Sequence, residues 1–123
     1  MSLTFGIVDY GVGNHSSVRQ CVKALGFSAK ISNEVDVLNS TDVLLLPGVG
    51  SFPAAMSFLK QRNLNEFLNE QKQIDKPIIG ICLGMELLFD NSTEKQEAGG
   101  LGLIPGQVVP LNTKRCHIGW NSL

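Results

Sequence analysis

The segment 77–89 constrains the fold of this chain more than any other stretch does. An apolar, β-branched run over 78–81 stops at Cys82, and the apolar spacing after Gly84 is helical. The pattern predicts a buried strand, a sharp turn with Cys82 at its apex, and a helix that runs back along the sheet. Gly80 and Gly84 lie two residues before and two after the cysteine, and such small neighbours let strand and helix pack closely beneath a reactive side chain.

The position of Cys82 predicts an activated nucleophile. At the start of a helix its thiolate would face unpaired backbone N–H groups and the positive end of the helix dipole, which both favour the ionised thiol. The alternative is a small buried hydrophobic side chain, which is what a cysteine in apolar surroundings usually is. The glycines on both sides and the change from strand to helix favour the nucleophile.

The composition is that of one domain with a single hydrophobic core. Of 123 residues, 43% are hydrophobic and 17% are charged. The formal net charge of −1 predicts binding neither to nucleic acid nor to an anionic membrane surface, and no apolar run is long enough to span a bilayer. Three cysteines at unpatterned spacings fit neither a disulfide framework nor a zinc site. Cysteines that form no disulfides are typical of proteins in the reducing cytoplasm, where we expect this protein. We expect no metal and no organic cofactor.

The rest of the chain alternates predicted strands and helices. Strands are expected over 5–10, 27–31 and 43–46, and helices over 18–25, 53–61 and 64–71. Strands that are apolar on both faces and separated by helices indicate a parallel sheet covered on both sides. We therefore predict an α/β fold with a doubly wound, mostly parallel sheet, helices on both faces, and one domain over 1–123. The first helix should bury Cys21 on its apolar face.

The loop over 47–53, after the third strand, is expected to face the same crevice as Cys82. In an open parallel sheet, ligands gather beyond the carboxyl ends of the strands. Glycines at 48 and 50 leave the Val49 peptide free to present its N–H, which with the N–H of Leu83 would form an oxyanion hole. The alternative is that Pro-Gly-x-Gly is merely a tight turn.

The last part of the chain is expected to leave the strand–helix alternation. Residues 90–97 are polar, which is typical of a solvated surface loop. Residues 99–109 alternate short apolar runs with glycine and proline, a pattern that predicts a β-turn or hairpin layer rather than another helix.

The sequence Gly-Ile-Cys-Leu-Gly-Met at 80–85 resembles the nucleophile signature of the class I, triad-type glutamine amidotransferases. Further segments narrow the resemblance to the glutaminase subunits of imidazole glycerol phosphate synthases: 9–14, 46–52, 100–106 and 117–121. The match runs from about residue 5 to residue 123. It implies a flavodoxin-like amidotransferase domain.

The resemblance implies a glutaminase reaction at Cys82. The thiolate attacks the side-chain amide of glutamine, ammonia leaves, and water releases glutamate from the thioester. Gly48, Val49 and Gly50 match the oxyanion strand of the family, and both glycines then contact the substrate. Glu86 stands where the family usually has a glutamine that helps to hold the substrate. Because a carboxylate can accept from the substrate's ammonium group, we expect retained but altered glutamine binding.

The resemblance also implies a partner that consumes the ammonia, a (β/α)₈ synthase subunit in a heterodimer. The positions that match partner-facing stretches of the family are Asn14, His117, Trp120 and Asn121. The implied pathway is histidine biosynthesis. Relatives with these motifs also serve amidation steps in bacterial surface-polysaccharide synthesis, and the sequence does not separate the two.

The catalytic His of the family, followed two residues later by Glu, has no counterpart up to Leu123. We therefore expect a C-terminally truncated domain that lacks its terminal strands and is inactive alone. The alternative is a non-catalytic binding module that keeps the partner surface. A third possibility is the group of related peptidases with a similar strand, turn and helix around the nucleophile. It is disfavoured because Leu83 stands where they typically have histidine.

Overall fold

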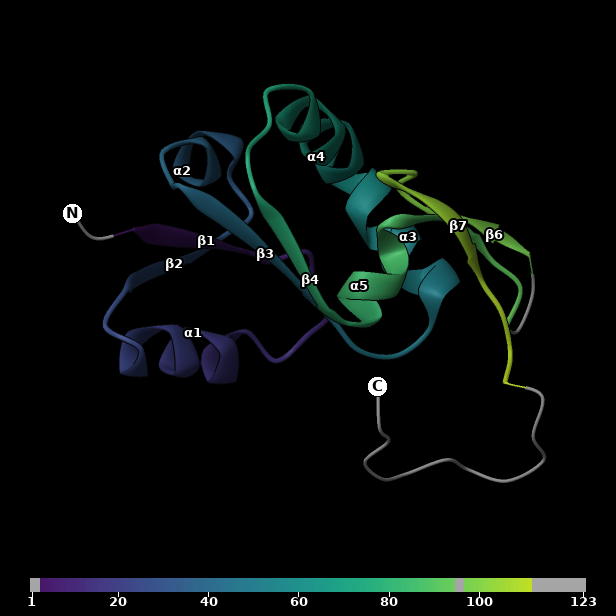
Figure 1. Cartoon of the computed structure of the whole chain (residues 1–123), viewed down its shortest axis with the longest axis horizontal. Coiled ribbons are helices and arrows are strands. Elements are labelled where there is room, and N and C mark those ends of the chain that lie inside the picture. Colours follow the sequence, from purple (N-terminus) through teal and green to yellow (C-terminus); the bar gives the residue numbers. More distant parts are fainter. Residues whose placement is uncertain (1–2, 95–96, 112–123) are drawn as a thin grey trace.

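The computed structural model describes residues 3–94 and 97–111. Its main sheet contains β1 (Thr4–Val8), β2 (Ser28–Ser32), β3 (Val43–Gly48) and β4 (Ile78–Cys82). The strands are all parallel, in the order β2–β1–β3–β4 (Figure 1). The helices are α1 (His15–Ala24), α2 (Val35–Asn39), α3 (Phe52–Gln61), α4 (Leu64–Gln73) and α5 (Leu83–Leu87). The sequence pattern does not predict α2, because five residues are too few to show a helical period.

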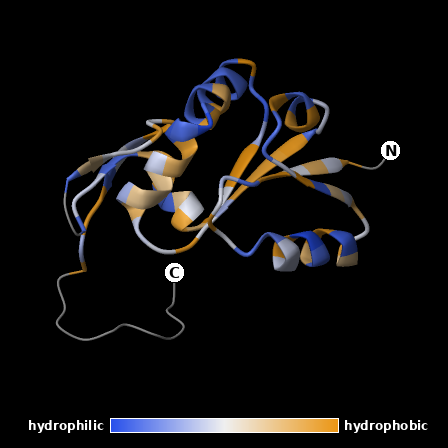
Figure 2. Cartoon of the chain, turned by 180° about the vertical axis from the view of Figure 1, so that it is seen from behind, coloured by the Kyte–Doolittle hydropathy of each residue, from blue (hydrophilic) through white to orange (hydrophobic). Residues whose placement is uncertain are grey.

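Helices cover both faces of the sheet, so the predicted α/β fold with a mostly parallel sheet is confirmed. On one face, Val22 of α1 packs against Ile7 and Leu45. On the other face, side chains of α2, α3, α4 and α5 share a larger apolar cluster with Leu44 and Leu46. Successive residues of β3 therefore enter different clusters, as the alternation of side chains along a strand requires. The central strands are accordingly strongly hydrophobic, and the helices are hydrophilic on their outer sides (Figure 2).

All six residues of β3 are buried, because this strand has a neighbour on each side and helices above and below. In the described part of the chain, β4 pairs with β3 alone, and Ile79 is 46% exposed. None of the helices within residues 3–94 and 97–111 has the length and apolar character that crossing a bilayer requires.

The prediction that Cys21 is buried is wrong: its side chain is exposed. The neighbouring Val22 is the residue of α1 that enters the core, and Cys21 lies at the border of an apolar groove. This groove of about 510 Å³ separates α1 from β4 and is also lined by Ile79 and Ile81. A helical period identifies the apolar side of α1, but it cannot show that β4, within the described residues, pairs with a strand on one side only.

A second, small sheet follows α5. It contains β5 (Phe89–Ser92), β6 (Ala98–Gly99) and β7 (Ile104–Val108), in the order β6–β5–β7. Strands rather than a further helix therefore occupy this region, as expected. The expected hairpin is not what pairs them, because β6 is antiparallel and β7 is parallel to β5.

The helix predicted after Gly84 does not extend to Phe89, and the surface loop predicted over 90–97 is wrong for its first residues, because Phe89–Ser92 form β5. Helix α5 ends at Leu87, whose carbonyl oxygen accepts from the N–H of Leu101 at 2.8 Å. The carbonyl oxygen of Leu88 likewise accepts from the N–H of Leu103 at 2.8 Å. These partners lie more than ten residues away along the chain, so the local apolar spacing could not reveal them.

Candidate active site

Cys82 lies where β4 ends and α5 begins. Its backbone has φ 56° and ψ −125°, a combination that residues with a side chain rarely adopt. Such strain persists only where the surrounding structure enforces it, and it is typical of functional sites. The side chain of Cys82 is exposed. The predicted strand, sharp turn and helix are therefore present, with the thiol at the apex; this unit of β4, Cys82 and α5 is the elbow.

The two flanking glycines permit this turn. A Cβ atom on Gly80 would lie 2.5 Å from the Cα of Met85, and one on Gly84 would overlap the carbonyl oxygen of Leu46. Strand β4, helix α5 and strand β3 can approach one another this closely only because both positions lack a side chain. The structure thus supplies the physical reason for the Gly-x-Cys-x-Gly spacing.

The loop after β3 lies beside the elbow, as the sequence predicts. Gly48 is in register with Cys82 across the β3–β4 pair. A Cβ atom on Gly48 would lie 2.9 Å from the backbone nitrogen of Gly84. Val49 is 55% exposed, and Gly50 has a φ of 92°, which glycine adopts without strain. This brings the Val49 and Leu83 segments to the same edge of the sheet.

The hydroxyl of Tyr10 holds this loop through a hydrogen bond, a contact that the sequence does not predict. Tyr10 is fully buried, and its Oη donates to the carbonyl oxygen of Pro47 at 2.6 Å. Burial raises the pKa of the Tyr10 hydroxyl well above its ordinary value. The only local signal is a hydroxyl-bearing residue at the end of an apolar strand, and it does not identify the acceptor 37 residues further on.

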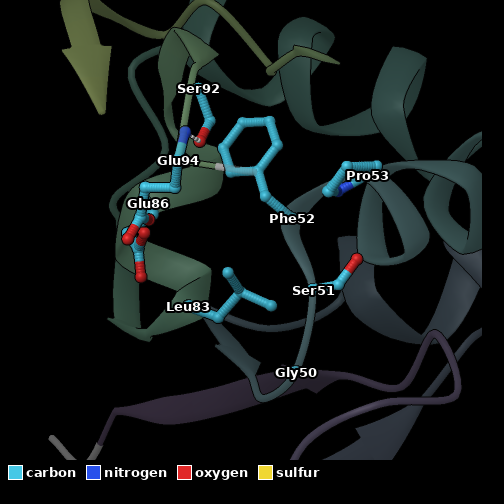
Figure 3. A pocket seen from close by; sticks show the side chains of 8 residues that line it. All are labelled: Gly50, Ser51, Phe52, Pro53, Leu83, Glu86, Ser92 and Glu94. Carbon is cyan, nitrogen blue, oxygen red and sulfur yellow. Dashed lines mark hydrogen bonds between the residues drawn. The ribbon is translucent and has the colours of Figure 1, made fainter. Parts of the chain in front are cut away.

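A cavity of about 280 Å³ opens next to the elbow (Figure 3). Its lining comes from the start of α3, from α5 and from the segment around β5: Gly50, Ser51, Phe52, Pro53, Leu83, Glu86, Ser92 and Glu94. The structure therefore brings together three predicted site residues, Gly50, Leu83 and Glu86. Ser92 and Glu94 were missed because the polar residues after 89 resemble a surface loop.

The carboxyl groups of Glu86 and Glu94 lie together at this cavity (Figure 3). Burial, and next the hydrogen bond and charge of the neighbouring Glu94 carboxyl, raise the pKa of Glu86 to about 7. At neutral pH the Glu86 carboxyl is therefore protonated for part of the time. Their combined charge can match one cationic group.

Four predicted site residues remain, and only Asn14 lies in the part of the chain that the structure describes. The side chain of Asn14 accepts from the backbone N–H of Ser17 at 3.3 Å and so caps α1. The next residue, His15, places its Nε2 3.7 Å from Oδ1 of Asp9. His117, Trp120 and Asn121 lie outside the described residues.

Sequence comparison decides the family. The profile of the family "Glutamine amidotransferase class-I" matches residues 6–123. The chain belongs to the class-I glutamine amidotransferases. The resemblance inferred from the sequence motifs is thereby confirmed.

Curated relatives of this class-I amidotransferase chain include HisH subunits of imidazole glycerol phosphate synthase. The chain is 45% identical over 119 residues to the subunit from Lactococcus lactis subsp. lactis (strain IL1403), covering 95% of this chain and 59% of the relative. It is 48% identical over 120 residues to the subunit from Bacillus cereus (strain B4264), covering 95% and 57%. The chain thus spans less than two thirds of the length of these relatives.

Solved structures share the fold of this amidotransferase chain. A crystal structure of a glutamine amidotransferase aligns with a TM-score of 0.76 at 19% identity, covering 90% of this chain and 58% of that one. A putative peptidase E from Listeria monocytogenes aligns with a TM-score of 0.68 at 13% identity, covering 83% and 63%. At such identities the likeness shows the fold alone.

Proposed function

We propose that the protein is the glutaminase subunit of an imidazole glycerol phosphate synthase, acting in histidine biosynthesis in the cytoplasm. The observation that carries the proposal is the exposed thiol of Cys82 at a strained turn beside Gly48. Family membership supplies the reaction class, and the HisH relatives supply the pathway.

In the proposed reaction, the Cys82 thiolate attacks the side-chain carbonyl carbon of glutamine. A C–S bond forms, the negative charge develops on the carbonyl oxygen, and the N–H groups of Val49 and Leu83 stabilise it. The carbonyl re-forms and the C–N bond breaks, while the nitrogen takes up the proton that the general base removed from the thiol, so that neutral ammonia leaves and a thioester remains. Water cleaves the thioester to give glutamate and the free thiol. Family resemblance assigns the general base to a His-x-Glu segment, which has no counterpart up to Leu123.

The cavity beside Leu83 suits the other end of the substrate. Glutamine carries an α-ammonium group, and the Glu86 and Glu94 carboxyl groups at the cavity would accept from it. Gly50 and Ser51, from the segment before α3, also line this cavity. Glutamine would then reach from the carboxyl pair to the elbow.

Ammonia released at Cys82 would pass to a (β/α)₈ synthase subunit in a heterodimer. The turn that contains Asn14 is the proposed contact region, together with His117, Trp120 and Asn121. In support, a Cβ atom on Gly13 would lie 3.3 Å from the Cβ of Pro47, so this turn packs against the loop beside the nucleophile. The same geometry would serve amidation in bacterial surface-polysaccharide synthesis, which differs in the acceptor of the ammonia.

A non-catalytic partner-binding module is the second candidate function. One observation favours it: within the described residues His15 is the only histidine, and its imidazole faces Asp9. The strained backbone and exposed thiol of Cys82 argue against this candidate, because backbone strain of this kind is typical of functional sites.

Glutamate release by the full-length protein, with and without its synthase partner, tests the proposal. We expect turnover that is abolished by Cys82→Ser and retained by Cys21→Ser, since Cys21 borders the groove between α1 and β4 and does not line the cavity. Tight partner binding without any glutamate release, in the wild-type protein and in both variants, would establish the binding module instead.

A further inference from the structure

The loop that carries Val49 is attached to the body of the molecule through Tyr10. Tyr10 follows closely on the end of β1, and its side chain is fully buried. Its Oη donates to the carbonyl oxygen of Pro47 at 2.6 Å, a short bond between segments that are 37 residues apart. The bond therefore ties the end of the first strand region to the end of β3.

The accepting carbonyl belongs to the peptide that sets the direction of the loop. The Pro47 carbonyl is followed by Gly48, which is in register with Cys82, and then by Val49. A Cβ atom on Gly48 would lie 2.6 Å from Oη of Tyr10, so the hydroxyl fills the space that a side chain would otherwise need. Rotation of this peptide would break the bond and move the Val49 N–H.

Burial of the aromatic ring does not require this hydroxyl. Phenylalanine would fill the same space in the core, whereas tyrosine adds a polar group that must find a partner when it is buried. Because burial raises the pKa of the Tyr10 hydroxyl, it stays a protonated donor throughout the pH range in which enzymes work.

We propose that Tyr10 is a positioning residue for the reaction, which holds the Pro47–Gly48 peptide so that the Val49 N–H faces the developing oxyanion. The inference rests on the proposed glutaminase function. Tyr10 does not touch the substrate. It acts through the loop, and its contribution belongs to the transition state rather than to glutamine binding.

Tyr10→Phe tests this role in the full-length protein, and Thr41→Val is the matched control. The Thr41 hydroxyl is also buried and donates at 2.6 Å to a backbone carbonyl, that of Leu38, but at the opposite end of β3. Each variant deletes one buried hydroxyl and its hydrogen bond, so both should lower the melting temperature. The effect of Thr41→Val should be the smaller one, because Nζ of Lys76 still donates to the Leu38 carbonyl.

We expect Tyr10→Phe to lower kcat about 10- to 100-fold with little change in KM, since small misplacements of reacting groups have effects of that order. Thr41→Val should leave both constants unchanged. Backbone ¹⁵N relaxation should show greater mobility at Val49 and Gly50 in Tyr10→Phe alone. Wild-type kcat in a folded Tyr10→Phe variant, or equal losses in the two variants, would overturn the inference.

The failure of the proposed function is a separate outcome. If the wild-type protein releases no glutamate with its partner present, the glutaminase proposal fails and the catalytic role of Tyr10 fails with it. The relaxation measurement then shows whether Tyr10 still holds the loop, which is the structural half of the inference.

Discussion

At the scale of single residues, Cys82 and Glu86 show how far a sequence can define a site. The spacing of Gly80 and Gly84 identifies the apex cysteine, because it reflects a local steric need that the structure contains. The position of Glu86 can be predicted as well. The contact between Glu86 and Glu94 cannot be predicted, because it is the fold of β5 that brings Glu94 to the same cavity.

The Glu86 carboxyl predicts a pH-dependent stability. Its pKa is raised from 4.5 to about 7 in the folded chain, so its contribution to stability is fully present below pH 4.5 and is lost as the pH rises to about 7. Glu86→Gln removes the ionised form. We therefore expect this variant to melt above the wild type at pH 8, and the difference in melting temperature to shrink towards pH 5.

Glu70→Gln is the control for that experiment, because Glu70 is exposed on α4. Differential scanning fluorimetry at pH 5, 6, 7 and 8 makes the comparison. A melting-temperature difference for Glu86→Gln that stays constant across this range would contradict the assigned pKa.

At the scale of elements, the sequence predicts the strand–turn–helix unit around Cys82, but it does not predict the residue at which the helix ends. The change from β-branched residues to helical spacing locates β4 and the start of α5 within a residue or two. The end of α5 depends on backbone donors from Leu101 and Leu103, which occupy the carbonyl oxygens of Leu87 and Leu88. Periodicity over a short window carries no information about such distant partners.

The close packing of this unit predicts a large effect for Gly84→Ala. A methyl group there would overlap the carbonyl oxygen of Leu46, so β3 and α5 would have to separate. We expect a loss of about 1–3 kcal/mol in the free energy of unfolding, the usual range for overpacking a tight interior.

Gly99→Ala is the matched control, because a Cβ atom at Gly99 would meet nothing within 4 Å. Its effect should stay within about 0.5 kcal/mol. Urea denaturation of both variants decides the point, and equal stability of the two would mean that the elbow is less tightly packed than described.

At the scale of the whole molecule, the order of elements predicts the parallel sheet. It does not predict how much of each face of the sheet the helices cover. Alternating apolar strands and helices indicate a sheet with two buried faces, and both faces do carry helices. The sequence places Cys21 in that core. The structure places it at the apolar groove beside β4, because α1 covers only part of its face.

The groove makes Cys21 accessible in the 123-residue chain. We expect a small neutral alkylating reagent to modify it under native conditions, at a rate close to that in denaturant. Peptide mapping after brief exposure measures this, with Cys21→Ser as the control for its peptide. Protection of Cys21 that disappears only in denaturant would show that the groove is closed.

Affinity labelling of the full-length protein with a glutamine-analogue chloroketone, followed by peptide mapping, tests for a glutamine site at Cys82 most directly. We predict a covalent label on Cys82 that added glutamine slows, whereas glutamine should not change any labelling of Cys21. Absence of label on Cys82, while a small alkylating reagent still modifies that thiol, would contradict a glutamine site at the elbow.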